Sequence, residues 1–196
     1  EFRWVTIKSE KPDEFQLTHP EEKPIQETDA QQVDPLSMER IPEEKTIDIT
    51  EGQKGISYEK LFLPYITGAK SIKICDPYIR LQYQIYNLMS FCEVLDTSNG
   101  EIELKLITDC DMHEELELTN KFDDIKTSLQ KDNINFEFEF NENQHDRWIE
   151  TDTGWKIILG RGLDIFQRPA DKFSIGFTDQ TKRKCKATTI VYTKKY

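Results

Sequence analysis

From residue 57 onward, segments with the apolar spacing of helices alternate with short segments typical of β-strands. The spacing predicts helices over 58–66, 81–95 and 116–129, and strands over 71–76, 102–107, 134–140, 147–150, 155–159 and 187–192. Apolar and polar residues alternate strictly from Ile134 to Phe140, as expected of a half-exposed strand. This order predicts a layered α/β domain with a mostly parallel or mixed sheet flanked by helices.

Residues 1–55 have a different character. Five prolines stand there among Glu, Gln, Asp and Thr, with few aliphatic residues. This composition is typical of a linker, or of an irregular acidic extension that wraps a domain. Residues 2–7 alternate apolar and polar side chains and either add one edge strand or belong to the same extension. The chain begins with Glu1, so we expect a piece of a longer protein, or a processed or trimmed start.

The charge of the chain is unevenly distributed. The formal net charge is −11, which argues against general or specific nucleic-acid binding. Residues 145–196 nevertheless hold 11 basic and 6 acidic side chains. We therefore expect any contact with an anion to involve this last quarter of the sequence.

Other compositional features bound the setting. The sequence contains no signal peptide and no apolar run of about 20 residues, so we expect a cytoplasmic protein without a membrane span. Its four cysteines show no paired spacing, which favours free thiols in a reduced compartment. Cys110 and His113 alone are too few ligands for a metal site, so we expect neither metal nor cofactor.

The most specific motif is His145-Asp146-Arg147, followed by Asp152. Alternate residues of a strand share a face, so His145 and Arg147 are expected to point together. A ring nitrogen, a fixed cation and a carboxylate can attack, hold and orient a phosphate diester. If the chain is catalytic, His145, Arg147 and Asp152 are the candidate catalytic residues. If it only binds phosphate, His145 and Arg147 remain candidates, because a guanidinium holds phosphate bidentately.

Two further elements could contribute to the same site. Arg161 and Asp164 stand in a Gly-Arg-Gly-Leu-Asp run, which is also consistent with an ordinary turn. Asp76 and Arg80 follow a predicted strand, where α/β sheets gather ligand groups. Alternatively, Asp76 caps the next helix, with Pro77 at its first position.

A concentrated run of cations comes near the end of the sequence. It either contacts an anionic surface or forms a solvated loop. Its candidate binding residues are Lys182, Arg183 and Lys184.

Five blocks of the sequence carry a family likeness. They are SYEKLF at 57–62, DPYIR at 76–80, YNLMSFCE at 86–93, HDR at 145–147 and GRGLD at 160–164. In this order they resemble the phospholipase-D-like domains of the MIT C-terminal family, with a match over residues 56–196. The His-x-Arg-x4-Asp spacing is one residue away from the His-x-Lys-x4-Asp signature of the phospholipase D superfamily. In that superfamily a Gly-Ser-x-x-Asn element follows, where this chain has Arg161 and Asp164.

The resemblance implies a single phospholipase-D-like half that forms a homodimer. It also implies a peripheral contact with membranes through acidic phospholipid headgroups, without established hydrolysis. It further implies that the chain is a bacterial relative attached to a larger Lon-related ATPase-type protein, although this sequence has no Gly-x4-Gly-Lys-Ser/Thr motif.

Three functions follow from these observations as hypotheses. The first is a non-catalytic homodimeric module that binds acidic phospholipids or other phosphate-bearing ligands. The second is a metal-independent phosphodiesterase or nuclease that uses His145 across a dimer. The third is a docking or oligomerisation module of a larger ATPase or protease.

Overall fold

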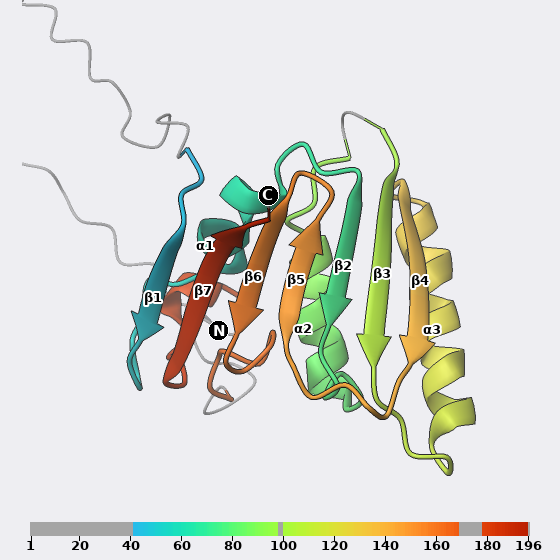
Figure 1. Ribbon diagram of the computed structural model, residues 1–196. Coiled ribbons are helices and arrows are strands. Elements are labelled where there is room, and N and C mark those ends of the chain that lie inside the picture. Colours follow the sequence, from blue (N-terminus) through green and yellow to red (C-terminus); the bar gives the residue numbers. More distant parts are fainter. Residues whose placement is uncertain (1–40, 98–99, 169–177, 196) are drawn as a thin grey trace, which may run out of the picture. The chain divides into compact units, whose positions relative to one another are not determined.

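The computed structural model describes residues 41–97, 100–168 and 178–195 (Figure 1). The possible edge strand at 2–7 lies outside these residues. In chain order the elements are β1 (Lys45–Ile49), α1 (Tyr58–Ile66), β2 (Ser71–Cys75), α2 (Gln82–Cys92), β3 (Ile102–Thr108), α3 (Glu115–Gln130), β4 (Ile134–Phe140), β5 (Trp148–Thr151), β6 (Trp155–Leu159), the 3-10 turn η2 (Gln180–Lys182) and β7 (Thr188–Lys194).

The strands form one seven-stranded mixed sheet in the order β1-β7-β6-β5-β2-β3-β4. The neighbours β2, β3 and β4 are parallel, and α2 and α3 make the crossovers between them. From β5 to β1 each neighbouring pair is antiparallel. The predicted fold class, an α/β domain with a mixed sheet and flanking helices, is confirmed.

Local chemistry explains where α1 begins and ends. Ser57 caps its start, because the hydroxyl oxygen accepts a hydrogen bond from Lys60 N at 3.2 Å. Gly68 follows its end with φ +77°, a conformation that glycine adopts without strain. The helix buries Tyr58, Phe62 and Tyr65 against the sheet.

Within a core that also contains many Ile and Leu side chains, aromatic residues of α1 and α3 contact the strands beneath them. Tyr65 of α1 stacks on Tyr192 of β7 with ring centroids 4.2 Å apart. At the other end of the sheet, Phe122 of α3 contacts a row of phenylalanines on β4. The alternation from Ile134 to Phe140 thus gives the half-exposed strand that was predicted, and its phenylalanines lie on the face that packs against α3.

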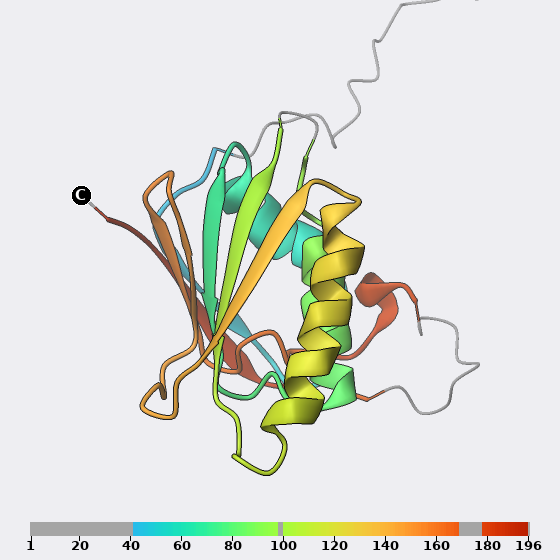
Figure 2. The same cartoon turned by 90° about the vertical axis from the view of Figure 1, so that its right-hand side faces the viewer.

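In the part of the chain that the structure describes, α1, α2 and α3 all lie on one side of the sheet (Figure 2). No helix of the described residues covers the other face. Ion pairs cross its strands, including Lys105–Glu139 and Lys156–Glu150. The aromatic side chain of Trp148 lies there too, beneath the Lys156 ammonium at 4.8 Å.

The sheet includes residues 45–49, which fall within the predicted extension of residues 1–55. This strand, β1, pairs with β7 from Lys45↔Tyr192 to Ile49↔Thr188. Its partner lies far along the chain, and this pairing gives the edge of the sheet its last strand.

Candidate functional site

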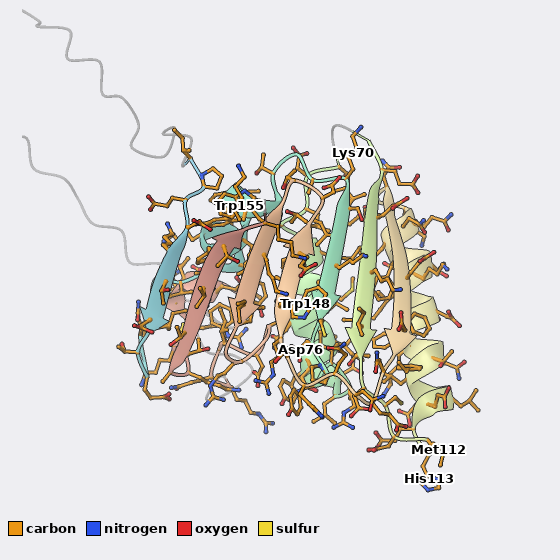
Figure 3. All side chains as sticks on the ribbon, viewed as in Figure 1. Lys70, Asp76, Met112, His113, Trp148 and Trp155 are labelled. Atoms are coloured by element: carbon orange, nitrogen blue, oxygen red, sulfur yellow. The ribbon has the colours of Figure 1, made fainter. Side chains whose placement is uncertain are left out.

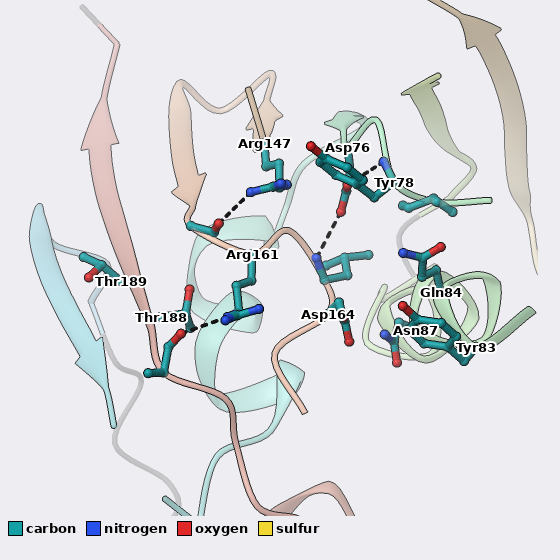
Figure 4. Close-up of a pocket in the computed structure, with 14 residues that line it drawn as sticks. Asp76, Tyr78, Tyr83, Gln84, Asn87, Arg147, Arg161, Asp164, Thr188 and Thr189 are labelled. Atoms are coloured by element: carbon teal, nitrogen blue, oxygen red, sulfur yellow. Dashed lines mark hydrogen bonds between the residues drawn. The ribbon is translucent and has the colours of Figure 1, made fainter. Parts of the chain in front are cut away.

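A hollow of about 590 Å³ lies at the edge of the sheet where β2 and β6 end and β7 begins (Figure 4). Several segments that are far apart in the sequence line it. Its lining residues are Asp76, Tyr78 and Ile79 after β2; Tyr83, Gln84 and Asn87 of α2; Arg147 before β5; Gly160, Arg161, Leu163 and Asp164 after β6; and Ala187, Thr188 and Thr189 at the start of β7.

Asp76 is a buried carboxylate at the base of this site, with 3% of its surface exposed. It accepts hydrogen bonds from Tyr78 N at 3.0 Å and from Leu163 N at 3.3 Å. Burial raises the pKa of Asp76, while these two amides and the nearby Arg147 guanidinium lower it in part. The carboxylate therefore ties the segment after β2 to the segment after β6.

Gly162 is the residue that lets these two segments approach. Its φ is +60°, and an added Cβ would lie 1.8 Å from Asp76 Oδ2. No side chain fits there without moving the buried carboxylate. The second glycine of the Gly-Arg-Gly run thus has a steric reason beyond an ordinary turn.

Arg147 lies on the wall of the hollow, held by two contacts. Its Nη1 donates to Gly160 O at 2.7 Å, and its guanidinium lies 4.3 Å from the centre of the Tyr78 ring. Among the described residues, no carboxylate forms an ion pair with it. A planar cation fixed on both sides in this way keeps further N–H groups for an anion.

Arg161 provides a second cation on the same hollow. Its Nε donates to Ala187 O at 2.9 Å, and within the described ranges it has no ion pair. Asp164 pairs instead with Lys186, at 2.7 Å between Oδ2 and Nζ. The carboxylate of Asp164 is therefore neutralised by a lysine, and the Arg161 guanidinium is not.

His145 is placed differently from Arg147. Both residues precede β5, in the segment that leads from β4, so strand alternation does not align their side chains. His145 is exposed and is not among the residues that line the hollow. The structure thus brings Arg147, but not His145, to the site.

The third member of the motif, Asp152, lies beyond the other end of β5. Both of its carboxylate oxygens accept from Lys70 N, at 3.1 and 3.2 Å. The four residues of β5 separate it from His145, a span of about 14 Å at ~3.4 Å per residue. Figure 3 shows Lys70 at the edge of the sheet opposite to Asp76. Within one chain, Asp152 is too distant to orient the imidazole.

A buried thiol anchors the segment that carries His145. Cys75 Sγ lies 3.4 Å from Asp146 O and 3.5 Å from Gln144 Oε1. Burial raises the pKa of the Cys75 thiol to about 11, and nearby carboxylates add to the shift. The thiol therefore stays neutral and donates to these acceptors.

Helix capping is not the role of Asp76. The helix α2 begins at Gln82, six residues later, so the alternative that Asp76 caps it with Pro77 at the first position is wrong. The amide of Leu81, at the start of α2, instead donates to Gln84 Oε1 at 2.9 Å.

The other predicted cations lie away from the hollow. Arg80 contacts Asp111 at 3.3 Å and Asp109 at 3.9 Å. Lys182 pairs with Asp179 at 3.2 Å, in η2. Arg183 stacks on the Phe166 ring at 4.8 Å, and Lys184 is exposed. None of these four predicted residues lines the site around Arg147.

Sequence reasoning did not single out several residues of the site. They are Tyr78, Tyr83, Gln84, Asn87, Lys186, Thr188 and Thr189. Tyr78 and Asn87 stand inside the blocks of the family likeness, which was the available signal. The contribution of β7 had no signal, because it depends on the pairing of β7 with β6.

Within the described residues, no group of three or more His, Cys, Asp or Glu side chains could hold a metal ion. No helix of these residues is long and apolar enough to cross a bilayer.

Comparisons with known proteins support the family likeness. The profile of a family described as "Phospholipase D-like domain at C-terminus of MIT" matches residues 55–194. MIT domain-containing protein 1 of Mus musculus is 37% identical over 151 residues, covering 74% of this chain and 60% of the mouse protein. The chain thus spans only about 60% of the length of that relative.

A solved structure of the archaeal chromatin protein TrmBL2, described as showing a novel mode of DNA binding, also matches. It covers 82% of this chain and 49% of its own, with 12% identity and a TM-score of 0.38. A likeness of this size supports no inference about function.

Proposed function

We propose a function for this chain, which belongs to the family of phospholipase D-like domains at the C-terminus of MIT. The hollow around Arg147 and Arg161 binds a phosphate-bearing ligand. The foremost candidate is the headgroup of an acidic phospholipid. The domain acts as a non-catalytic module in this proposal. It binds the phosphate oxygens through the two guanidinium groups, at the periphery of a membrane.

The main support for the proposal is that both arginines keep N–H donors that the described residues do not use. Each donates one described hydrogen bond to a main-chain carbonyl, Gly160 O for Arg147 and Ala187 O for Arg161. A guanidinium has five N–H donors, so both keep donors for an anion. Charge-assisted hydrogen bonds of this kind are among the stronger ones in proteins.

The hollow contains two carboxylates, Asp76 and Asp164, but their repulsion of a bound anion is weakened. Asp164 is paired with Lys186, which offsets its charge. Asp76 lies at the base, where burial raises its pKa and two main-chain amides occupy its oxygens. The site therefore favours an anion over a cation.

Binding is favoured over hydrolysis because of the positions of His145 and Asp152. Hydrolysis by a phosphohistidine route needs an imidazole beside the phosphate and a group that orients it. His145 does not line the hollow, and Asp152 is engaged with Lys70 N at the opposite edge.

We propose further that the domain forms a homodimer, as the family likeness implies. Its uncovered sheet face supports this, because Trp148, Ile158 and Val191 lie side by side across β5, β6 and β7. Ile158 is 44% exposed on this face. Light scattering should give twice the mass of the chain, and Ile158→Lys should give a folded monomer. A wild-type monomer at high concentration would contradict this part of the proposal.

The binding proposal is tested by co-sedimentation with phosphatidylcholine vesicles that contain phosphatidylserine as the minority lipid. Replacing both arginines, R147A with R161A, should lower the affinity by about tenfold or more, since hydrogen bonds to charged groups contribute roughly 1.5–3 kcal/mol each. The matched control is R168A, which removes an exposed arginine outside the hollow.

Inorganic phosphate, titrated while the amide spectrum is recorded by NMR, separates the anion site from the lipid surface. The wild-type chain should show shifts at residues 160–164 that the double variant lacks. Equal vesicle binding by wild type, double variant and control would contradict the proposal.

A further inference from the structure

Large hydrophobic side chains are exposed at one place beside the phosphate-binding hollow. Leu81, Tyr83 and Tyr86 are 57%, 49% and 62% exposed. We call these three residues the rim patch. Tyr83 also lines the hollow, so the rim patch is continuous with the site of Arg147.

The rim patch lies at the start of α2 and serves no purpose in the core. The buried side of this helix consists of Ile85, Leu88, Phe91 and Cys92. Tyr83 and Tyr86 are three residues apart, so they are neighbours on its outer side. Single exposed apolar residues need no explanation, whereas three together beside an anion site call for one.

The chemistry of α2 fits the surface of a bilayer. The helix sequence, QYQIYNLMSFC, contains no charged residue. Tyrosine has an apolar ring and a polar hydroxyl, and it is enriched at the interface between lipid and water. An uncharged helix end with two tyrosines and a leucine can therefore enter this zone without burying a charge.

A second group of exposed hydrophobic residues helps to orient the molecule. Met112, at the tip of the connection from β3 to α3 (Figure 3), is 80% exposed, and Leu116, in the first turn of α3, is 76% exposed. This segment is strongly acidic, with Asp109, Asp111, Glu114, Glu115 and Glu117. Asp109 and Asp111 are paired with Arg80, and Glu117 with Lys121, whereas Glu114 and Glu115, beside Met112 and Leu116, form none of the described ion pairs. An anionic bilayer repels these two carboxylates, so the rim patch, and not Met112 and Leu116, should enter the lipid.

We infer that Leu81, Tyr83 and Tyr86 insert into the interfacial zone of an anionic bilayer while a lipid phosphate occupies the hollow of Arg147 and Arg161. The inference rests on the proposed function and adds the contact that distinguishes a membrane from a free phosphate. The arginines bind the oxyanion, and the rim patch supplies the apolar contact with the surrounding lipids.

The first experiment separates these two contributions. The variant L81A with Y86A changes the two rim residues that do not line the hollow. It should bind the phosphatidylserine-containing vesicles about tenfold more weakly, because two large side chains no longer bury apolar surface. Its affinity for inorganic phosphate should stay at the wild-type value. The variant L81M with Y86F, which keeps a large apolar side chain at both positions, should retain most of the vesicle binding. M112A with L116A is the matched control and should bind as the wild type does.

The second experiment locates the insertion directly. Tryptophan introduced by Y86W should be quenched by lipids brominated on the acyl chain near the headgroup. Tryptophan introduced by M112W should show no quenching beyond that of the unmodified chain.

Each outcome distinguishes the inference from its premise. Unchanged vesicle binding by L81A with Y86A, or absence of quenching in Y86W, overturns the insertion and leaves the arginine site intact. Loss of phosphate binding in L81A with Y86A makes these two side chains part of the anion site and also overturns it. Phosphate binding that survives R147A with R161A refutes the proposed function itself. Thermal unfolding of each variant identifies any that has lost its fold.

Discussion

At the scale of single residues, the site depends on one steric relation that a sequence pattern cannot reveal. The Gly160–Asp164 run was predicted to contribute Arg161 and Asp164, and both line the hollow. Gly162, in the same run, has a steric role that was not predicted. It makes room for the buried carboxylate of Asp76, which lies 86 positions earlier in the numbering. Only the folded chain brings these two residues together.

Gly162→Ala should therefore destabilise the fold strongly. The added methyl group would meet Asp76 Oδ2 at 1.8 Å, and φ is +60°. We expect a loss of at least ~2 kcal/mol in the free energy of unfolding, measured with urea. The control is Gly55→Ala, where φ is +85° but nothing lies within 4 Å, with an expected loss of about 1 kcal/mol. Equal losses in the two variants would show that the contact with Asp76 is unimportant.

Asp76 itself should give the stability a particular pH dependence. Burial raises its pKa in the folded state above the usual value of about 3.9. The stabilising contribution of such a carboxyl is complete below the unfolded pKa and is lost as the pH rises through the folded pKa. Between about pH 4 and neutrality, the wild type should thus lose stability relative to D76N.

Urea unfolding of both chains over this pH range measures that difference. The asparagine of D76N lacks one acceptor oxygen, which changes the free energy of unfolding of this variant by an amount that does not depend on pH. The informative quantity is therefore how the difference in unfolding free energy between the two chains changes with pH. A difference that is constant with pH, or that grows in favour of the wild type, would contradict the prediction.

At the scale of elements, the spacing of apolar residues was sufficient to predict a helix or strand wherever one face of the element is apolar and the other is polar. The helix predicted at 116–129 is α3, Glu115–Gln130, and the strand predicted at 134–140 is β4. The strand β1 was not predicted, because Lys45–Ile49 has only two aliphatic residues and stands in an acidic, proline-containing region. Its stability comes from pairing with β7, a contact that local sequence does not encode.

The packing of α3 on β4 provides a test at this scale. Phe122 is fully buried and contacts the rings of Phe136, Phe138 and Phe140. Phe122→Ala should lower the free energy of unfolding by about 3–5 kcal/mol, as large buried aromatics do. Phe140→Ala is the comparison, and its loss should be smaller because that ring is only partly buried. Similar losses of unfolding free energy in the two variants would contradict the close packing of α3 on β4.

At the scale of the whole molecule, the basic character of residues 145–196 was a partial guide to the site. Arg147, Arg161 and Lys186 come from this region and meet at or beside the hollow. The run at 182–184, at the end of η2 and directly after it, comes from this region too, but none of its side chains lines the hollow. Net charge identifies a region of the sequence, whereas the paths of the chain between strands determine which cations converge.

The position of His145 leads to a prediction about hydrolysis by the assembled protein. Cleavage of bis-p-nitrophenyl phosphate in the presence of EDTA should not exceed that of His145→Ala, since no imidazole of the described residues lines the hollow in one chain. Cleavage that resists EDTA and disappears in His145→Ala would favour the phosphodiesterase, with the histidine supplied across a dimer.

The place of β7 in the sheet has a consequence for biosynthesis. This strand separates β1 from β6, although β1 precedes it by more than a hundred residues in the chain. While the ribosome is still translating, β1 has no neighbour to pair with, and the wall of the hollow that β7 forms does not yet exist. A nascent chain must therefore emerge beyond residue 194 before it can complete this sheet, so the hollow is not fully formed during synthesis of the domain.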